Sequence, residues 1–177
     1  SNSNYVFLFD IDTTGDIWII DSEINATRYR TSTIKLEGSE VLIRNSTIWS
    51  GAHNSDSGSW CNEAYDEAHS GCGYGTNGRY TRSYLTLNAN NLTIEDSDLK
   101  ATSEMTSTTP NYSSYYYYRR AHTYVDIDVE YDMEVHDSLI LGYVRNNGPN
   151  GQNDDAIMDY DTSSKNLEVH DSIVKGK

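Results

Sequence analysis

A ten-residue phrase occurs five times in this chain and limits its possible folds more than any other feature. Each copy reads apolar, any, apolar, any, Asp or Asn, Ser, any, apolar, any, small. Alternation on both sides of a fixed polar pair predicts two short strands joined by a bend, each strand with one buried face. The copies are Ile17 to Ala26, Val41 to Ser50, Leu92 to Ala101, Met133 to Gly142 and Leu167 to Gly176.

The polar pair of the phrase defines a column of bends. If the copies stack at the strand spacing of about 4.8 Å, these side chains can hydrogen-bond along the column or to the turn backbone. We therefore expect them to orient the bend. The bend residues are Asp21, Asn45, Asp96, Asp137 and Asp171.

A second apolar run precedes each phrase, which gives three strands per turn. The runs are Val6 to Ile11, Thr33 to Leu36, Tyr84 to Leu87, Val125 to Val129 and Ala156 to Tyr160. A repeated unit that cannot bury its apolar face alone is typical of a solenoid coil. The pattern resembles the right-handed parallel β-helix repeat proteins of pectin-lyase-like architecture, over nearly the whole chain. The resemblance implies an all-β solenoid of about five coils, with residues 1–177 forming a single domain.

The spacing of the bends predicts where the chain leaves the solenoid. Successive bend residues are 24, 51, 41 and 34 positions apart. The longer gaps predict three loop insertions, at about 50–80, 102–122 and 143–155. Insertions of this kind project from the coils and often carry function.

The first insertion contains both cysteines, Cys61 and Cys72. A disulfide between them would restrict a long loop that has little core of its own, and it implies an oxidising compartment. Two alternatives remain open: a zinc site that adds His53 and His69, and a pair of solvated thiols.

The second insertion contains four consecutive tyrosines, Tyr115, Tyr116, Tyr117 and Tyr118. Planar aromatic rings with a polar tip suit stacking against sugars. Consecutive side chains cannot all face one way, so the alternative is that they pack the loop against the solenoid wall.

The third insertion ends in Asn153-Asp154-Asp155-Ala156-Ile157. This stretch resembles the paired-aspartate segment of pectin-degrading β-helix hydrolases, which implies general acid and base roles for Asp154 and Asp155. No Gly-His-Gly segment and no Arg-x-Lys follows the pair. The sequence therefore favours a turn cap or a calcium ligand at this place over catalysis, and we expect no other cofactor.

Four glycosylation sequons begin at Asn25, Asn45, Asn91 and Asn111. All four fall at outward strand positions, bends or loops. We therefore expect the protein to be glycosylated if it is exported.

The outward face of the phrase places two histidines beside two carboxylates, Glu134, His136, Glu168 and His170. Such a patch can hold a divalent cation. The alternative is that these four side chains are ordinary solvent-exposed residues on the face of a sheet and bind no ion.

The net charge of the chain and the sequence of its two ends indicate which binding partners the protein can have. The net charge of −14 disfavours nucleic acid and anionic membranes, and no apolar run is long enough to span a bilayer. We expect no helix that would cap an open coil at either end, and we expect any targeting segment to have been removed or to lie outside these residues. We expect an extracellular structural β-helix that assembles head to tail into a filament or belongs to a surface stalk. The alternative is a module that binds or cleaves carbohydrate through the Tyr-rich and Asp-Asp loops.

Overall fold

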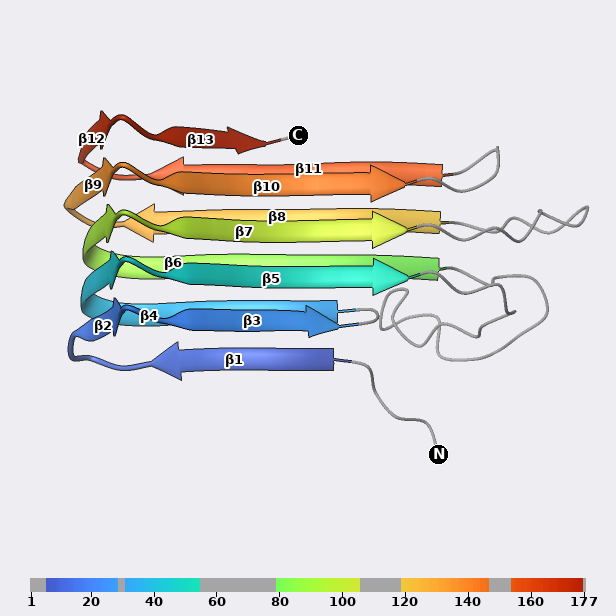
Figure 1. Ribbon diagram of the computed structural model, residues 1–177, viewed down its shortest axis with the longest axis horizontal. Helices are drawn as coiled ribbons and strands as arrows, with labels where there is room; N and C mark the ends of the chain where they lie inside the picture. The colour runs from blue at the N-terminus through green and yellow to red at the C-terminus, as the bar shows by residue number, and fades with distance from the viewer. Residues whose placement is uncertain (1–5, 29–30, 55–78, 106–118, 147–153, 177) are drawn as a thin grey trace, which may run out of the picture.

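The computed structural model describes residues 6–28, 31–54, 79–105, 119–146 and 154–176. Every regular element in these ranges is a β-strand (Figure 1). The strands form two sheets, and all strand pairs are parallel.

The first sheet combines long strands on one wall with short strands around the end of the solenoid. The long strands are β1 (Val6–Asp12), β4 (Thr31–Arg44), β6 (Arg79–Glu95), β8 (Arg119–Val129) and β11 (Asp154–Ser163). The short strands are β2 (Ile17–Ile20), β9 (Asp132–His136) and β12 (Asn166–His170). The second sheet contains β3 (Glu23–Arg28), β5 (Thr47–Asn54), β7 (Asp98–Met105), β10 (Leu139–Asn146) and β13 (Ile173–Gly176).

The chain alternates between the sheets, so each coil runs along one wall, around the end and back along the other wall (Figure 1). β4 and β6 are long enough to continue around the end, because each pairs with both a long and a short strand. Equivalent positions of the repeated phrase lie in register, as Ile17 with Val41 and Leu92 with Met133. The predicted parallel β-helix of five coils is confirmed.

The core consists of the inward columns of the repeat. Large side chains near the bends are fully buried, such as Ile34, Leu36, Ile43, Ile48, Leu85, Leu87, Ile94 and Leu99. Farther from the bends many inward residues are small, such as Ser32, Ser50, Ala52, Ser83 and Ala101, although Met105 is also fully buried. There the Ser50 hydroxyl donates to Ser32 Oγ at 3.0 Å, and the Ser83 hydroxyl lies 3.0 Å from Ser50 Oγ. Paired hydroxyls thus join the two sheets where the interior narrows.

The strands run farther from the bends than the predicted apolar runs. β5 continues to Asn54 and β7 to Met105, while β8 begins at Arg119. The sequence assigned 50–54, 79–80, 102–105, 119–122, 143–146 and 154–155 to insertions, but these residues lie in strands. β5, β7 and β10 end, and β6, β8 and β11 begin, at the end of the solenoid opposite the bends (Figure 1).

Candidate functional site: the bend column and the two end coils

The five bend residues share an unusual backbone conformation. Their φ angles are all positive, between 47° and 50°, and no other described non-glycine residue has a positive φ. Asp and Asn tolerate this left-handed region better than other residues with a side chain. The sequence therefore predicted the bend positions correctly. The main requirement at each bend position is a residue that tolerates a positive φ angle.

The serine that follows each bend residue makes the hydrogen bonds expected of the bend column. Each Ser amide donates to the hydroxyl of the next coil's serine, at distances of 2.9–3.1 Å, and four such bonds link Ser22, Ser46, Ser97, Ser138 and Ser172. Each hydroxyl donates in turn to the carbonyl two residues before it. Among the described bend side chains, one bond runs along the column, from Asn45 Nδ2 to Asp21 Oδ1 at 2.7 Å.

The bend conformation gives a testable prediction at Asp137, whose φ is 48°. Asp137→Leu should lower the free energy of unfolding by about 1 kcal/mol, because leucine is strained in the left-handed region. Asp137→Gly should be neutral or slightly stabilising, because glycine adopts this φ freely. Urea denaturation measures both, with Glu134→Lys on the exposed face as a near-neutral control. Equal losses for leucine and glycine would mean that the aspartate side chain matters more than its φ.

The backbone hydrogen bonds around each bend repeat with the same donors and acceptors between successive coils. Each bend amide donates to a carbonyl of the next coil, as Asp137 N to His170 O at 3.1 Å. Each Ser carbonyl accepts from the next coil, as Ser138 O accepts from Ile173 N at 2.9 Å. The two ends of the column therefore present different and complementary groups.

The last coil presents the amides of Asp171 and Ser172 and the carbonyl of Ser172. The first coil presents the carbonyl of Ile20, the hydroxyl of Ser22 and the amide of Glu23. Within the described residues, β1, β2 and β3 have no partner on the first edge, and β11, β12 and β13 have none on the last edge. These edges are sites where another strand can add.

The last coil also exposes apolar side chains that would be buried inside the stack. Leu167 and Val169 are 58% and 42% exposed, although they are in register with the buried Met133 and Val135. Val174, in register with the buried Ile140, is 38% exposed. The inward side chains of the first coil are better covered, since Ile17 and Ile19 are buried and Phe9, Ile11 and Ile24 are partly buried. Leu8 and Trp18 of this coil are 61% and 69% exposed. Among the inward columns of the repeat, exposed apolar surface is thus greater on the last coil.

An open groove runs beside the bends. Its lining is acidic and polar, and comprises Asp21, Ser22, Glu23, Asn45, Ser46, Thr47, Asp96 and Asp98. Within the described part of the chain, no group of three or more His, Cys, Asp or Glu side chains is arranged to hold a metal ion. The groove is therefore a negatively charged surface.

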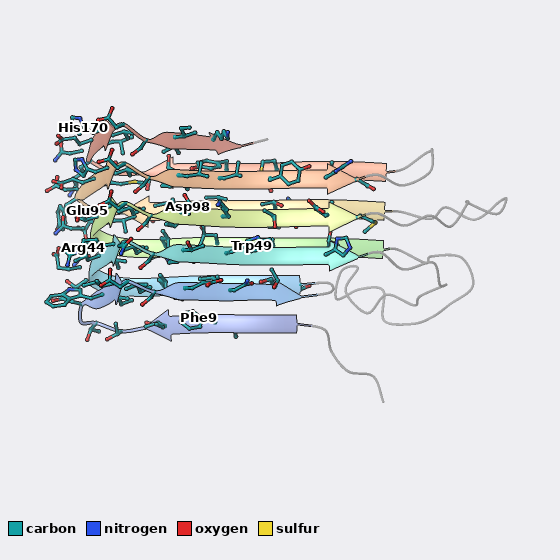
Figure 2. All side chains as sticks on the ribbon, in the orientation of Figure 1. Phe9, Arg44, Trp49, Glu95, Asp98 and His170 are labelled. Atoms are coloured by element: carbon teal, nitrogen blue, oxygen red, sulfur yellow. The ribbon has the colours of Figure 1, made fainter. Side chains whose placement is uncertain are left out.

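The four candidate metal ligands on the end wall lie together as two separate pairs. Glu134 and His136 are in register with Glu168 and His170, and the imidazole rings stack with centroids 5.1 Å apart. His170 Nε2 lies 2.5 Å from Glu168 Oε1, and His136 Nε2 lies 3.8 Å from Glu134 Oε2. Each imidazole thus faces the carboxylate of its own strand. Figure 2 shows His170 on the same end wall as Arg44 and Glu95.

Several sequence candidates lie outside what the structure describes. These are Cys61, Cys72, His69, Asn111 and Tyr115 to Tyr118. His53 lies in β5 with its Nδ1 3.8 Å from Glu104 Oε2. Asp154 and Asp155 begin β11, where only their backbone is described, in register with Arg119 and Arg120. Their catalytic, turn-capping or calcium-binding roles stay predictions.

An aromatic cluster lies on the outer wall, and the sequence had placed its His122 in the second insertion. His122 and Tyr124 lie in β8, and Tyr124 stacks on Tyr84 with centroids 4.5 Å apart and planes 6° from parallel. The Tyr124 hydroxyl lies 2.6 Å from His122 Nδ1, and His122 Nε2 lies 2.7 Å from Asp159 Oδ2. Burial is the main cause of the raised pKa of Tyr124, so its hydroxyl keeps its proton at neutral pH. The cluster links three coils, and strand register was the signal needed to find it.

The fold defines the class of protein as a parallel β-helix solenoid, and within the described residues its first and last coils present complementary groups. Comparison with family models, with curated proteins and with solved structures finds no match for this chain. No helix capable of crossing a membrane occurs in the described ranges.

Proposed function

We propose that this chain is an extracellular structural β-helix that stacks end to end, as a filament or as part of a surface stalk. The observation that carries the proposal is the match between the two open edges of the bend column. The three-stranded coils and bend repeat also support a place among the right-handed, pectin-lyase-like β-helices.

The match is specific in both hydrogen bonding and apolar contacts. A second copy placed one coil beyond the last would bring its Ile20 carbonyl to the Asp171 amide and its Ser22 hydroxyl to the Ser172 amide. These are the bonds that Arg44 O and Ser46 Oγ already make with the first coil. The same placement covers the exposed Leu167, Val169 and Val174 with Ile17, Ile19 and Ile24 of the copy, which are their equivalents in the repeat.

The contact joins two different surfaces, so each added molecule leaves the same edge open again. A heterologous contact of this kind propagates into a fibre unless its geometry closes a ring. Backbone pairing along three strands and burial of the apolar last coil both favour it.

Electron microscopy of the purified 177-residue chain tests the proposal. Five coils at about 4.8 Å each predict an axial subunit repeat of about 24 Å. Filaments with this repeat are the expected result. A chain that remains monomeric at high concentration contradicts self-assembly and favours a stalk whose neighbouring coils belong to the same longer polypeptide.

Charge at the junction predicts that acid strengthens the association. The pKa of Asp126 is raised by burial and then by the carboxylates of Asp161 and Asp128. Asp161 is in register with Asp126, and Asp10 occupies the equivalent position in the first coil. Docking therefore places Asp10 of the second copy next to Asp161 of the first, in the column that contains Asp126. In the second copy, Asp10 is also in register with Lys35. Docking thus brings like charges together and acid relieves their repulsion, so association should strengthen as pH falls.

Asp161→Asn should strengthen association at neutral pH and weaken its pH dependence. Sedimentation velocity between about pH 4 and pH 7 covers the range where carboxylates titrate. Glu95→Gln, in the third coil and away from both edges, is the matched control and should behave like the unmodified chain. A pH dependence that is identical in all three proteins would place the responsible carboxylates elsewhere.

A further inference from the structure

The three sequons in the described part of the chain differ in what their asparagine side chains contact. Asn91 is partly buried, its Nδ2 donates to Glu40 Oε1 at 2.7 Å, and its Oδ1 accepts from the Asp132 amide at 3.2 Å. Both ends of this carboxamide are therefore used to join neighbouring coils. A sugar on Asn91 Nδ2 would displace the carboxylate of Glu40.

Asn45 is exposed but is held in the bend column. Its φ is 48°, and its Nδ2 donates to Asp21 Oδ1 at 2.7 Å. A sugar on this nitrogen would have to share the space with Asp21, and it would cover the acidic groove beside the bends. The folded column therefore disfavours a glycan at this position.

Asn25 has a different environment on the outer face of β3. Its side chain is exposed, and its one hydrogen bond among the described residues is accepted by Oδ1 from the Thr27 hydroxyl at 2.8 Å. Residues two apart in a strand share a face, which brings the sequon hydroxyl to the carboxamide. The bond occupies Oδ1 and leaves Nδ2 without a hydrogen-bond partner among the described residues.

An indole ring lies beside Asn25 on the same face. Trp49 of β5 is in register with Asn25 and 37% exposed, and Figure 2 marks its position on this wall. Its Nε1 donates to Thr102 Oγ1 at 2.8 Å. A Cβ at Gly51 would lie only 3.1 Å from this Nε1 and 2.6 Å from Thr27 Cγ2. The absence of a side chain at Gly51 therefore lets the indole lie against the sheet near Thr27.

We propose that Asn25 carries an N-linked glycan whose first sugar packs on the indole of Trp49. The donor is a sugar activated as a pyrophosphate ester. A bond forms between Asn25 Nδ2 and the anomeric carbon, the bond from that carbon to the phosphate oxygen breaks, the pyrophosphate leaves with the electron pair, and Nδ2 releases one proton. The apolar face of the attached sugar then covers the fixed aromatic ring. This inference rests on the proposed extracellular location.

The glycan is compatible with end-to-end stacking. Side chains stand perpendicular to the plane of a sheet, whereas a docking copy adds within that plane at the free edge of β3. The sugar would therefore leave along the wall of the solenoid and keep the edge open. It would also shield an exposed sheet surface in a filament whose repeating units all carry the same sugar.

Glycopeptide mass spectrometry tests the site after secretion of the chain from a eukaryotic host. Enzymatic release in ¹⁸O-labelled water marks each occupied asparagine as aspartate. We expect the label at Asn25 and none at Asn45 or Asn91, and Thr27→Ala should remove it. An unmodified Asn25 overturns the proposal, whether or not another sequon is occupied.

The packing on Trp49 has its own readout by NMR. Sugar protons over an indole shift upfield through the ring current, so the first sugar should lose this shift in Trp49→Leu and keep it in Trp18→Leu. Trp18 is 69% exposed on the end wall and is the matched control. A shift that is absent from the outset, or unchanged in Trp49→Leu, overturns the packing. Electron microscopy of the same material separates the two proposals, because filaments without a glycan refute only this inference and glycosylated monomers refute only self-assembly.

Discussion

Val169→Pro is expected to abolish end-to-end association while leaving the five coils folded. His170 O accepts from Asp137 N, so the backbone of His170 faces β9. Backbone groups of successive strand residues face opposite neighbours, so the N–H and C=O of Val169 face the open edge. Proline removes that outward donor and places its ring against the incoming strand. We expect association to weaken by about 100-fold or more, equal to roughly 3 kcal/mol.

Val169→Ile is the matched control, because it keeps the backbone donor and the apolar side chain. Sedimentation velocity should show assembly for Val169→Ile and monomers for Val169→Pro, with the same circular dichroism spectrum for both. Ile19→Pro should behave differently, since Ile19 O accepts from Ser46 Oγ at 3.3 Å and its backbone therefore faces β4. That change should lower the stability of the coil stack itself. Assembly of Val169→Pro at the concentration where the control assembles would show that β12 is not the docking edge.

The repeat was sufficient to predict the coils because the inward columns are apolar and periodic. Ile43, Ile94 and Val135 occupy the same column of the phrase, and all are buried in the structure. A one-residue slip would turn such a column toward solvent, so the pattern determines the strand register as well as the strands. This is why the order of the five coils follows from the sequence.

Apolar periodicity failed to predict the strands where the inward residues are polar. Ser32, Ser50 and Ser83 are completely buried, yet an apolar pattern does not count them. Their hydroxyls hydrogen-bond to one another and to a carbonyl group inside the core. Because these hydroxyls have partners, burying them avoids the free-energy cost of burying an unpaired polar group. Pairing partners on the other sheet are not visible in the sequence, and the predicted insertions therefore began several residues too early.

The bend positions were predicted correctly, but among the described residues the expected hydrogen bond along the column occurs once, between Asn45 and Asp21. Asp137 was expected to hold the turn by hydrogen bonds, whereas its positive φ and the following Ser138 account for the observed geometry. The signal was available, because serine occupies its place in all five copies of the phrase while the bend residue varies between Asp and Asn. The proposed docking edges follow from the direction of these bonds, which required the three-dimensional structure.

Ser97→Ala is expected to cost about 1–3 kcal/mol of unfolding free energy, because it leaves a buried amide without an acceptor. Ser97 is 3% exposed, and its hydroxyl accepts from the Ser46 amide at 3.1 Å while donating to Glu95 O at 2.6 Å. Glu95 O keeps a second donor, the Asn45 amide, at 3.0 Å. The unsatisfied group after the change is therefore the N–H of Ser46, a residue that is 5% exposed.

Ser22→Ala separates this effect from the loss of a hydroxyl as such. Ser22 is exposed in the first coil, where its hydroxyl donates to Ile20 O at 2.6 Å and accepts from no amide of the described residues. Its replacement should stay within about 0.5 kcal/mol, as for ordinary surface changes. Urea denaturation should be done at a concentration low enough to keep the protein monomeric, since assembly adds to apparent stability. If both alanine variants lose the same stability, the serines act locally within each turn and the ladder between coils contributes little.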